Sequence, residues 1–343
     1  MKKLLLTLLT LTLTLPLASA APARPAAAEK KKVIVTLAAL KSITDAVAGD
    51  DFEVTALAKP DQDPHMVSPT PTLMKKLREA DLFIEIGLQL ELWADQVATG
   101  SGNPNLATGA RGRLIASAGI SREEVPSVVS RSEGDIHPEG NPHIWIDPIR
   151  AKQIADNIAA GLKGIAPETS AAVDERLKKF KERIDDALFG PELVKEVGSR
   201  ALTRKTLDGS LLTWLEERKL IGKLGGWLLK ARPLRGAKVI EYHKTWIYLG
   251  KILGFEIVGS IQSKPGIEPG PKHIEELKAI IAAQKVKLII VDNFYDPSVP
   301  NALARDTGVK VAIVPGQPGG EAGTDDYVAF MGFVIDKLVE AAK

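Results

Sequence analysis

The chain has 343 residues, with 45 basic and 43 acidic side chains, five histidines and no cysteine. The absence of cysteine excludes disulfides and a cysteine-linked lipid anchor. The balanced charge, without a basic stripe or an acidic tail, argues against a protein that binds nucleic acid or a membrane surface. The length fits two domains of about 100–150 residues each.

The first twenty residues have the pattern of a secretory signal peptide. Met1–Lys3 is basic, Leu4–Leu17 consists almost entirely of Leu and Thr, and Ala18–Ala20 is a small-residue cleavage site. The apolar segment is shorter than the about 20 residues that a spanning helix needs. We therefore predict export as a soluble, non-lipidated protein of the bacterial periplasm, with a flexible Ala/Pro tether over residues 21–31.

Short apolar segments alternate with helical patterns between residues 32 and 148. The expected strands are 32–37, 52–58 and 80–87, and helices are expected over 40–48, up to 77 and over 90–98. Largely apolar strands separated by helices are typical of a parallel sheet covered on both faces. The sequence thus predicts a first α/β lobe over 32–148.

Linking helices are expected over residues 149–190. Apolar residues recur there at helical spacing, namely Val173, Leu177, Phe180, Ile184 and Leu188. This spacing predicts one amphipathic helix from Pro167 to Leu188, and a helix of about 20 residues is about 30 Å long, enough to cross between two lobes. An ordinary helix within one lobe is the alternative. Residues 191–235 are less regular, and we treat them as an insertion of unknown role.

A second α/β series occupies residues 236–343. Its expected strands are 237–242, 255–261, 286–293 and 309–315, with helices over 272–283 and 325–342. The predicted fold class is therefore α/β: two lobes, each a parallel four-stranded sheet with flanking helices, bridged by one long interdomain helix.

Three histidines fall where such sheets place their ligand-binding groups. His65 follows the second expected strand, His243 ends the first strand of the second lobe, and His143 lies at the edge of the first lobe in the segment DIHPEGNPHIWIDP. Ligands of parallel α/β sheets bind beyond the carboxyl ends of the strands. Because both lobes contribute, we predict a site in the cleft between them. Three neutral imidazoles and one oxygen would suit tetrahedral Zn²⁺.

The oxygen ligand has two candidates, and each histidine has an ordinary alternative. Asp325 follows the last expected strand, but it would also serve as the N-cap of the final helix. Asp292 ends the preceding strand. The three histidines could instead lie in a plain loop, a packed turn and a core hydrogen bond. His137 is expected to be peripheral, with at most a weak capture role, and His273 to be a solvated surface residue.

Longer segments resemble the periplasmic solute-binding proteins of zinc and manganese ABC transporters, the ZnuA/TroA-like family. These segments are DPHMVSPTPTLMKKLREADLFIEIGLQLE, GNPHIWIDPIRA, VIEYHKTWIYLGKILGFEIVGSI, PGIEPGPKHIEELKAII and GTDDY. The resemblance covers the chain from about Lys32 onward, except residues 191–235. It implies two lobes joined by a long helix, with metal ligands at His65, His143 and His243. It also implies a monomer without enzymatic activity that delivers its metal ion to a membrane permease.

The metal and its fourth ligand depend on how this chain departs from the family. Some manganese-selective members have Glu at the position of His243, so the histidine here favours zinc, with manganese as the alternative. Many members have an aspartate directly after the last strand, where this chain has Pro315-Gly316. The fourth ligand is therefore open between Asp325, Asp292 and water, and Asp325 is our candidate. The long His/Asp-rich loop of some zinc members is also missing.

Two other functions compete with capture of zinc for transport. A zinc hydrolase would use the three histidines and a metal-bound water, with Glu241 or Glu139 as general base. A surface adhesin or structural protein could retain a metal for stability. The signal peptide without an anchor argues against this third reading.

Overall fold

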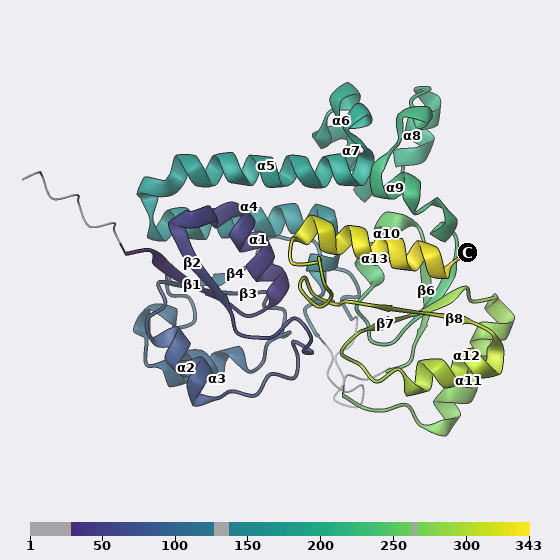
Figure 1. Cartoon of the computed structure of the whole chain (residues 1–343), viewed down its shortest axis with the longest axis horizontal. Coiled ribbons are helices and arrows are strands. Elements are labelled where there is room, and N and C mark those ends of the chain that lie inside the picture. Colours follow the sequence, from purple (N-terminus) through teal and green to yellow (C-terminus); the bar gives the residue numbers. More distant parts are fainter. Residues whose placement is uncertain (1–28, 127–136, 263–265) are drawn as a thin grey trace, which may run out of the picture. The chain divides into compact units, whose positions relative to one another are not determined.

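The computed structural model describes residues 29–126, 137–262 and 266–343 (Figure 1). The expected signal peptide and most of the expected tether lie outside these ranges. Residues Lys31–Lys343 form one compact unit with two parallel four-stranded sheets and flanking helices, so the predicted fold class is confirmed. Within the described residues, no helix combines the length and the apolar character that crossing a bilayer requires.

The first sheet has the strand order β2-β1-β3-β4, and all neighbours are parallel. Its elements are β1 (Lys31–Val35), α1 (Ala38–Ala48), β2 (Phe52–Ala56), α2 (Pro71–Arg78), β3 (Leu82–Glu85), α3 (Ala94–Ser101) and β4 (Arg113–Ile115). Strand β4 was not predicted, because it has three residues and begins with a charge. That charge is satisfied inside the lobe, where Arg113 Nε lies 2.8 Å from Glu85 Oε1.

The second sheet repeats this order as β6-β5-β7-β8, also parallel throughout. Its elements are β5 (Lys238–Glu241), α10 (Ile247–Leu253), β6 (Glu256–Ser260), α11 (Pro271–Gln284), β7 (Leu288–Asp292), α12 (Ser298–Thr307), β8 (Lys310–Val314) and α13 (Tyr327–Ala341). Helix α13 begins later than predicted, because Asp326 is its N-cap: the carboxylate accepts hydrogen bonds from the amides of Val328 and Ala329. Asp325 is therefore not the cap.

Two long helices follow the first sheet in the chain, as the expected linking helices over residues 149–190 (Figure 1). They are α4 (Pro148–Ile165) and α5 (Ser170–Phe189), which pack side by side and are joined by a 3₁₀ turn over Pro167–Thr169. Helix α5 contacts α1 of the first lobe and α13 of the second, so it is the helix that bridges the lobes.

The segment of unassigned role folds into short helices at one end of α5 (Figure 1). They are α6 (Pro191–Val197), α7 (Ser199–Leu207), α8 (Leu211–Glu217) and α9 (Gly226–Lys230), with 3₁₀ turns over Ile221–Lys223 and Arg232–Leu234. The two ends of the segment meet, because the Gly225 amide donates to the Phe189 carbonyl at 2.8 Å. Gly190 has a positive φ of 87°, and a Cβ there would lie 2.8 Å from Gly225 Cα. The segment is therefore a closed excursion from the main fold.

The largest apolar cluster contains residues of both lobes, including Val33, Trp145, Phe180, Val239 and Tyr327. Smaller clusters fill the other face of each sheet. The lobes therefore share one core. A hydrogen bond from the Tyr327 hydroxyl to the Trp145 carbonyl, at 2.7 Å, fixes the second lobe against the turn that carries His143.

Candidate metal site

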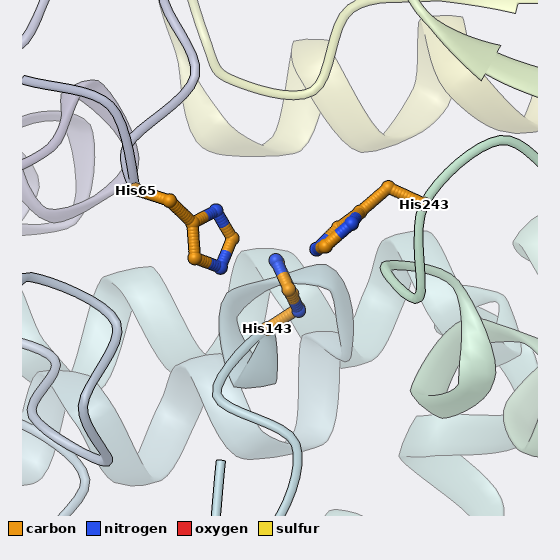
Figure 2. A group of neighbouring side chains, drawn as sticks. All are labelled: His65, His143 and His243. Atoms are coloured by element: carbon orange, nitrogen blue, oxygen red, sulfur yellow. The ribbon is translucent and has the colours of Figure 1, made fainter. Parts of the chain in front are cut away.

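Three histidines from distant parts of the sequence converge between the lobes (Figure 2). His65 lies in the loop after β2, His143 directly precedes the 3₁₀ turn Ile144–Ile146, and His243 follows β5. One ring nitrogen of each lies within 4.8 Å of the others, and the ring centroids are 5.0–5.2 Å apart. This is the one such group of His, Asp and Glu side chains found among the described residues.

Each of these rings is oriented by a hydrogen bond at Nδ1. The acceptors are Asp63 Oδ1 for His65 (2.8 Å), Asn141 Oδ1 for His143 (2.9 Å) and Gln262 Oε1 for His243 (3.2 Å). Because an oxygen acceptor at Nδ1 requires the proton there, Nε2 of each ring keeps its lone pair. The three Nε2 atoms are then the ones able to bind a cation together.

The buried rings are held in the neutral form. His143 and His243 are 3% and 2% exposed. Burial, followed by the nearby imidazoles, lowers the pKa of His143 well below its usual value and that of His243 to about 3. Neutral imidazole is the form that binds transition metals, so these two ligand candidates need not lose a proton at neutral pH.

The partners of these rings also connect the two lobes. The Asp63 carboxylate accepts the hydroxyl of Tyr295, from the loop after β7, at 3.0 Å. Burial alone would raise the pKa of Asp63, but its hydrogen bonds and charge interaction with His65 lower it overall. Asn141 is held from the second lobe too, because its side-chain amide donates to the Lys244 carbonyl at 2.7 Å.

The structure does not bring Asp325 to the three histidines. Its side chain is exposed, its carbonyl accepts a hydrogen bond from Ser42 Oγ at 2.8 Å, and it lies outside the histidine group. The physical reason is the preceding loop, which closes on itself: Gly319 donates to the Thr324 carbonyl at 2.9 Å. This closed loop separates Asp325 from the end of β8.

Asp292 is also outside the histidine group, although it ends β7 as expected. It is fully buried, and burial raises its pKa to about 8. A Cβ on Gly316 would lie 2.7 Å from its Oδ1, so the carboxyl group packs directly against the Gly316 backbone. Its place in the fold, against Gly316 and outside the histidine group, is the reason we do not count it among the candidate ligands.

His137, which was expected to be peripheral, lies beside the three histidines, directly against His65, although it is not a member of their group. Its Nε2 lies 3.3 Å from His65 Nε2, and the ring is mostly buried. Burial, followed by the interaction with His65, lowers its pKa to about 4. His137 and His143 lie on the same loop. The loop turns after His137, where the Gly140 amide donates a hydrogen bond to the His137 carbonyl at 3.0 Å. The short spacing of the two histidines in HPEGNPH was the signal in the sequence.

Both candidate general bases of a hydrolase make contacts with other parts of the protein. Glu241 is fully buried; its carboxyl group accepts hydrogen bonds from the Trp246 amide (2.9 Å) and the Ser260 hydroxyl (3.2 Å). Burial raises its pKa to about 8. Glu139 is exposed and pairs with Arg122 at 3.1 Å. Both side chains have structural partners of their own.

Comparison with known proteins gives relatives across both lobes. The zinc-binding protein AdcA of Streptococcus pyogenes is 23% identical over 323 residues, which cover 92% of this chain and 56% of AdcA. The chain thus spans about half the length of such relatives. The high-affinity zinc uptake system protein ZnuA of Yersinia pestis is 21% identical, over 91% of each chain.

Solved structures share the two-lobed fold. A crystal structure of ZnuA has a TM-score of 0.68 at 18% identity, covering 92% of this chain and all of the other. The solute-binding protein FpvC of Pseudomonas aeruginosa, in complex with Mn²⁺, has a TM-score of 0.70 at 19% identity, covering 92% and 99%. The family model for ZnuA, the periplasmic component A of the zinc-uptake complex, matches residues 33–188 and 228–341. Since this match takes in most of both lobes and omits between them only residues 189–227, the chain belongs to the ZnuA family.

Proposed function

We propose that this protein captures a zinc ion between its lobes and delivers it to the permease of a metal ABC transporter. The ligands in this proposal are Nε2 of His65, His143 and His243. The observation that carries it is the convergence of three imidazoles whose Nδ1 atoms are all hydrogen-bonded. Such a set is oriented for a cation before the cation arrives, which lowers the cost of binding.

Zinc is the preferred ion because the converging donors are nitrogens. Imidazole suits Zn²⁺, whereas Mn²⁺ prefers carboxylate, carbonyl and water oxygens. The names of the AdcA and ZnuA relatives point the same way. Manganese remains the alternative, supported by the Mn²⁺ complex of FpvC.

Transport rather than catalysis follows from the surroundings of the three rings. A zinc hydrolase needs a base within reach of the metal-bound water. Glu241 accepts a hydrogen bond from the Trp246 amide in the turn before α10, and Glu139 pairs with Arg122. We place the protein in the periplasm, because its first residues have the pattern of a signal peptide and its family is periplasmic.

The decisive experiment is calorimetric titration of the metal-stripped, purified protein with Zn²⁺ and Mn²⁺. We expect one zinc per chain, bound more tightly than manganese. His65→Ala and His243→Ala should each abolish tight binding, whereas His273→Ala, which alters a histidine on α11, should not. Failure of the wild-type protein to bind either ion would refute the proposal, and turnover of ester substrates by the zinc-loaded protein would favour a hydrolase.

A further inference from the structure

A fourth imidazole lies at the edge of the histidine group. His137 Nε2 is 3.3 Å from His65 Nε2. Two nitrogens bound to one tetrahedral zinc, each at about 2.0–2.1 Å, are about 3.3–3.4 Å apart. The two rings therefore already have the separation of neighbouring ligands on one zinc ion.

A hydrogen bond accounts for this contact in only one tautomer of His137, the one in which Nε2 carries the proton. Since His65 Nδ1 donates to Asp63, His65 Nε2 presents a lone pair towards His137. His137 Nδ1 is buried without a well-aligned partner, although backbone groups of Leu88 and Gln89 face the ring and oppose the fall of its pKa. In the other tautomer, Nδ1 carries the proton towards these backbone groups, and Nε2 is left with a lone pair that faces the lone pair of His65. A shared cation would use both lone pairs.

The fold supplies no competing donor at this position among the described residues. Asp325 is exposed, and Asp292 lies against Gly316 outside the group. His137 is itself held by the loop that carries His143: the Asn141 amide donates to the Glu123 carbonyl at 2.8 Å, and Arg122 pairs with Glu139. The ring centroid of His137 is 6.4 Å from that of His143, against 5.2 Å between His143 and His65. The His137 ring is therefore further from His143 than the His65 ring is, and His137 lies beside the group of three rather than within it.

We propose that Nε2 of His137 is the fourth ligand of the bound ion and completes a four-imidazole site. This inference rests on the proposed function, since it concerns the same ion. Its consequence is selectivity, because replacing an oxygen ligand by a fourth imidazole favours Zn²⁺ over Mn²⁺.

Zinc-edge X-ray absorption of the full-length protein, loaded with one equivalent of Zn²⁺, tests the proposal directly. We expect four imidazoles around zinc in the wild-type protein and in His273→Ala, and three plus an oxygen in His137→Ala. Three imidazoles in the wild-type protein would overturn the fourth ligand. That result would leave the proposed function standing, because the proposed function is tested separately by zinc binding to the wild-type protein and to the His65→Ala and His243→Ala variants.

Competition with a chelator adds a second measurement. Loss of a residue that only orients a ligand typically costs about 10–100-fold in metal affinity, so His137→Ala should weaken zinc binding by about 100-fold or more. His137→Asp replaces the imidazole nitrogen with a carboxylate oxygen. This variant should recover part of the zinc affinity, while the ratio of zinc affinity to manganese affinity should be lower than in the wild type. Unchanged zinc affinity in His137→Ala would overturn the inference. Thermal unfolding of the metal-free variants shows whether either fails to fold, and the wild-type absorption measurement decides the question even then.

Discussion

The hydroxyl of Tyr295 donates a hydrogen bond to Asp63 Oδ2 at 3.0 Å, across the boundary between the lobes. The other carboxylate oxygen of Asp63 accepts from both the backbone amide and Nδ1 of His65, at 2.9 and 2.8 Å. One carboxylate thus orients a candidate ligand of the first lobe and is itself held by the second. The position of His65 Nε2 therefore depends on the relative placement of the lobes.

Replacing this carboxylate should weaken metal binding without removing a ligand. Asp63→Ala should lower zinc affinity by about 10–100-fold, since His65 would lose both its preferred tautomer and its orientation. Asp63→Asn should lose less, because an amide oxygen still accepts from Nδ1. Tyr295→Phe is the matched control for the contact between lobes. In calorimetric titrations, zinc affinity should be lowest for Asp63→Ala, higher for Asp63→Asn and highest for Tyr295→Phe. Equal affinities for Asp63→Ala and the wild type would contradict this role of the carboxylate.

Asn141 should be important for both stability and metal binding. Its Oδ1 accepts from the backbone and from Nδ1 of His143, while its amide donates to the Lys244 carbonyl. Asn141→Ala would leave these buried groups without partners, at a cost of about 1–3 kcal/mol in the free energy of unfolding. We expect a lower midpoint in urea denaturation of the metal-free protein, together with weaker zinc binding. Asn105→Ala, at an exposed turn, serves as control and should alter neither.

Zinc binding should persist at mildly acidic pH. Burial, together with the neighbouring imidazoles, keeps the pKa of His243 at about 3 and that of His143 well below its usual value. For an ordinary histidine with a pKa of about 6.5, the neutral fraction falls about tenfold between pH 7.5 and 5.5, and this would apply to each of the two rings. We therefore expect zinc affinity to fall by no more than about tenfold over this range. A loss of 1,000-fold, measured by chelator competition, would show that the rings titrate as in water.

The buried carboxyl group of Asp292 should make the metal-free protein less stable as pH rises. Burial raises its folded-state pKa to about 8, against 3.8 for an ordinary aspartate. The folded state therefore holds a proton that the unfolded chain releases above about pH 4. This group's contribution to stability is complete below pH 4 and is lost as pH rises through 8, by up to about 1.4 kcal/mol per pH unit.

Asp292→Asn removes this titration while keeping the shape of the side chain. In urea denaturation, the variant should gain stability relative to the wild type between pH 5 and pH 8. If the free energies of unfolding of the variant and the wild type changed with pH in the same way, Asp292 would not titrate as described. Because we do not place Asp292 among the ligands, the variant should still bind one zinc per chain, and loss of that stoichiometry would make Asp292 a ligand after all.

The helical excursion after α5 should be dispensable for metal binding. Its ends meet at Gly190 and Gly225, and the family match omits residues 189–227. Deletion of residues 191–224, with Gly190 joined to Gly225, should leave zinc stoichiometry unchanged. The melting temperature should fall, because Leu202 and Leu215 of the excursion belong to the main core. Loss of zinc binding in a folded deletion variant would instead give this segment a role in the site.

Local patterns in the sequence were sufficient for the two-lobed α/β fold and for the three converging histidines. The strands β5 to β8 were predicted as apolar runs, and a residue directly after a parallel strand must lie at the carboxyl edge of its sheet. His243 was identified by this rule, His65 by its place in the loop that follows β2, and His143 by its place in GNPHIW. Strand β4 was missed, since three residues beginning with Arg113 carry too little apolar signal to stand out from a loop.

Only the tertiary structure decided which other side chains reach the site. Asp325 was chosen because it follows β8 in the sequence, but a loop closed by Thr324 moves it away from the strand end. His137 was expected to be peripheral, with at most a weak capture role. Its partner is His65, which lies 72 positions earlier in the loop after β2. Periodicity and spacing report the contacts that a residue makes within its own element. The sequence alone therefore determined the two lobes and three of the imidazoles, whereas the packing of loops from both lobes decided what surrounds them.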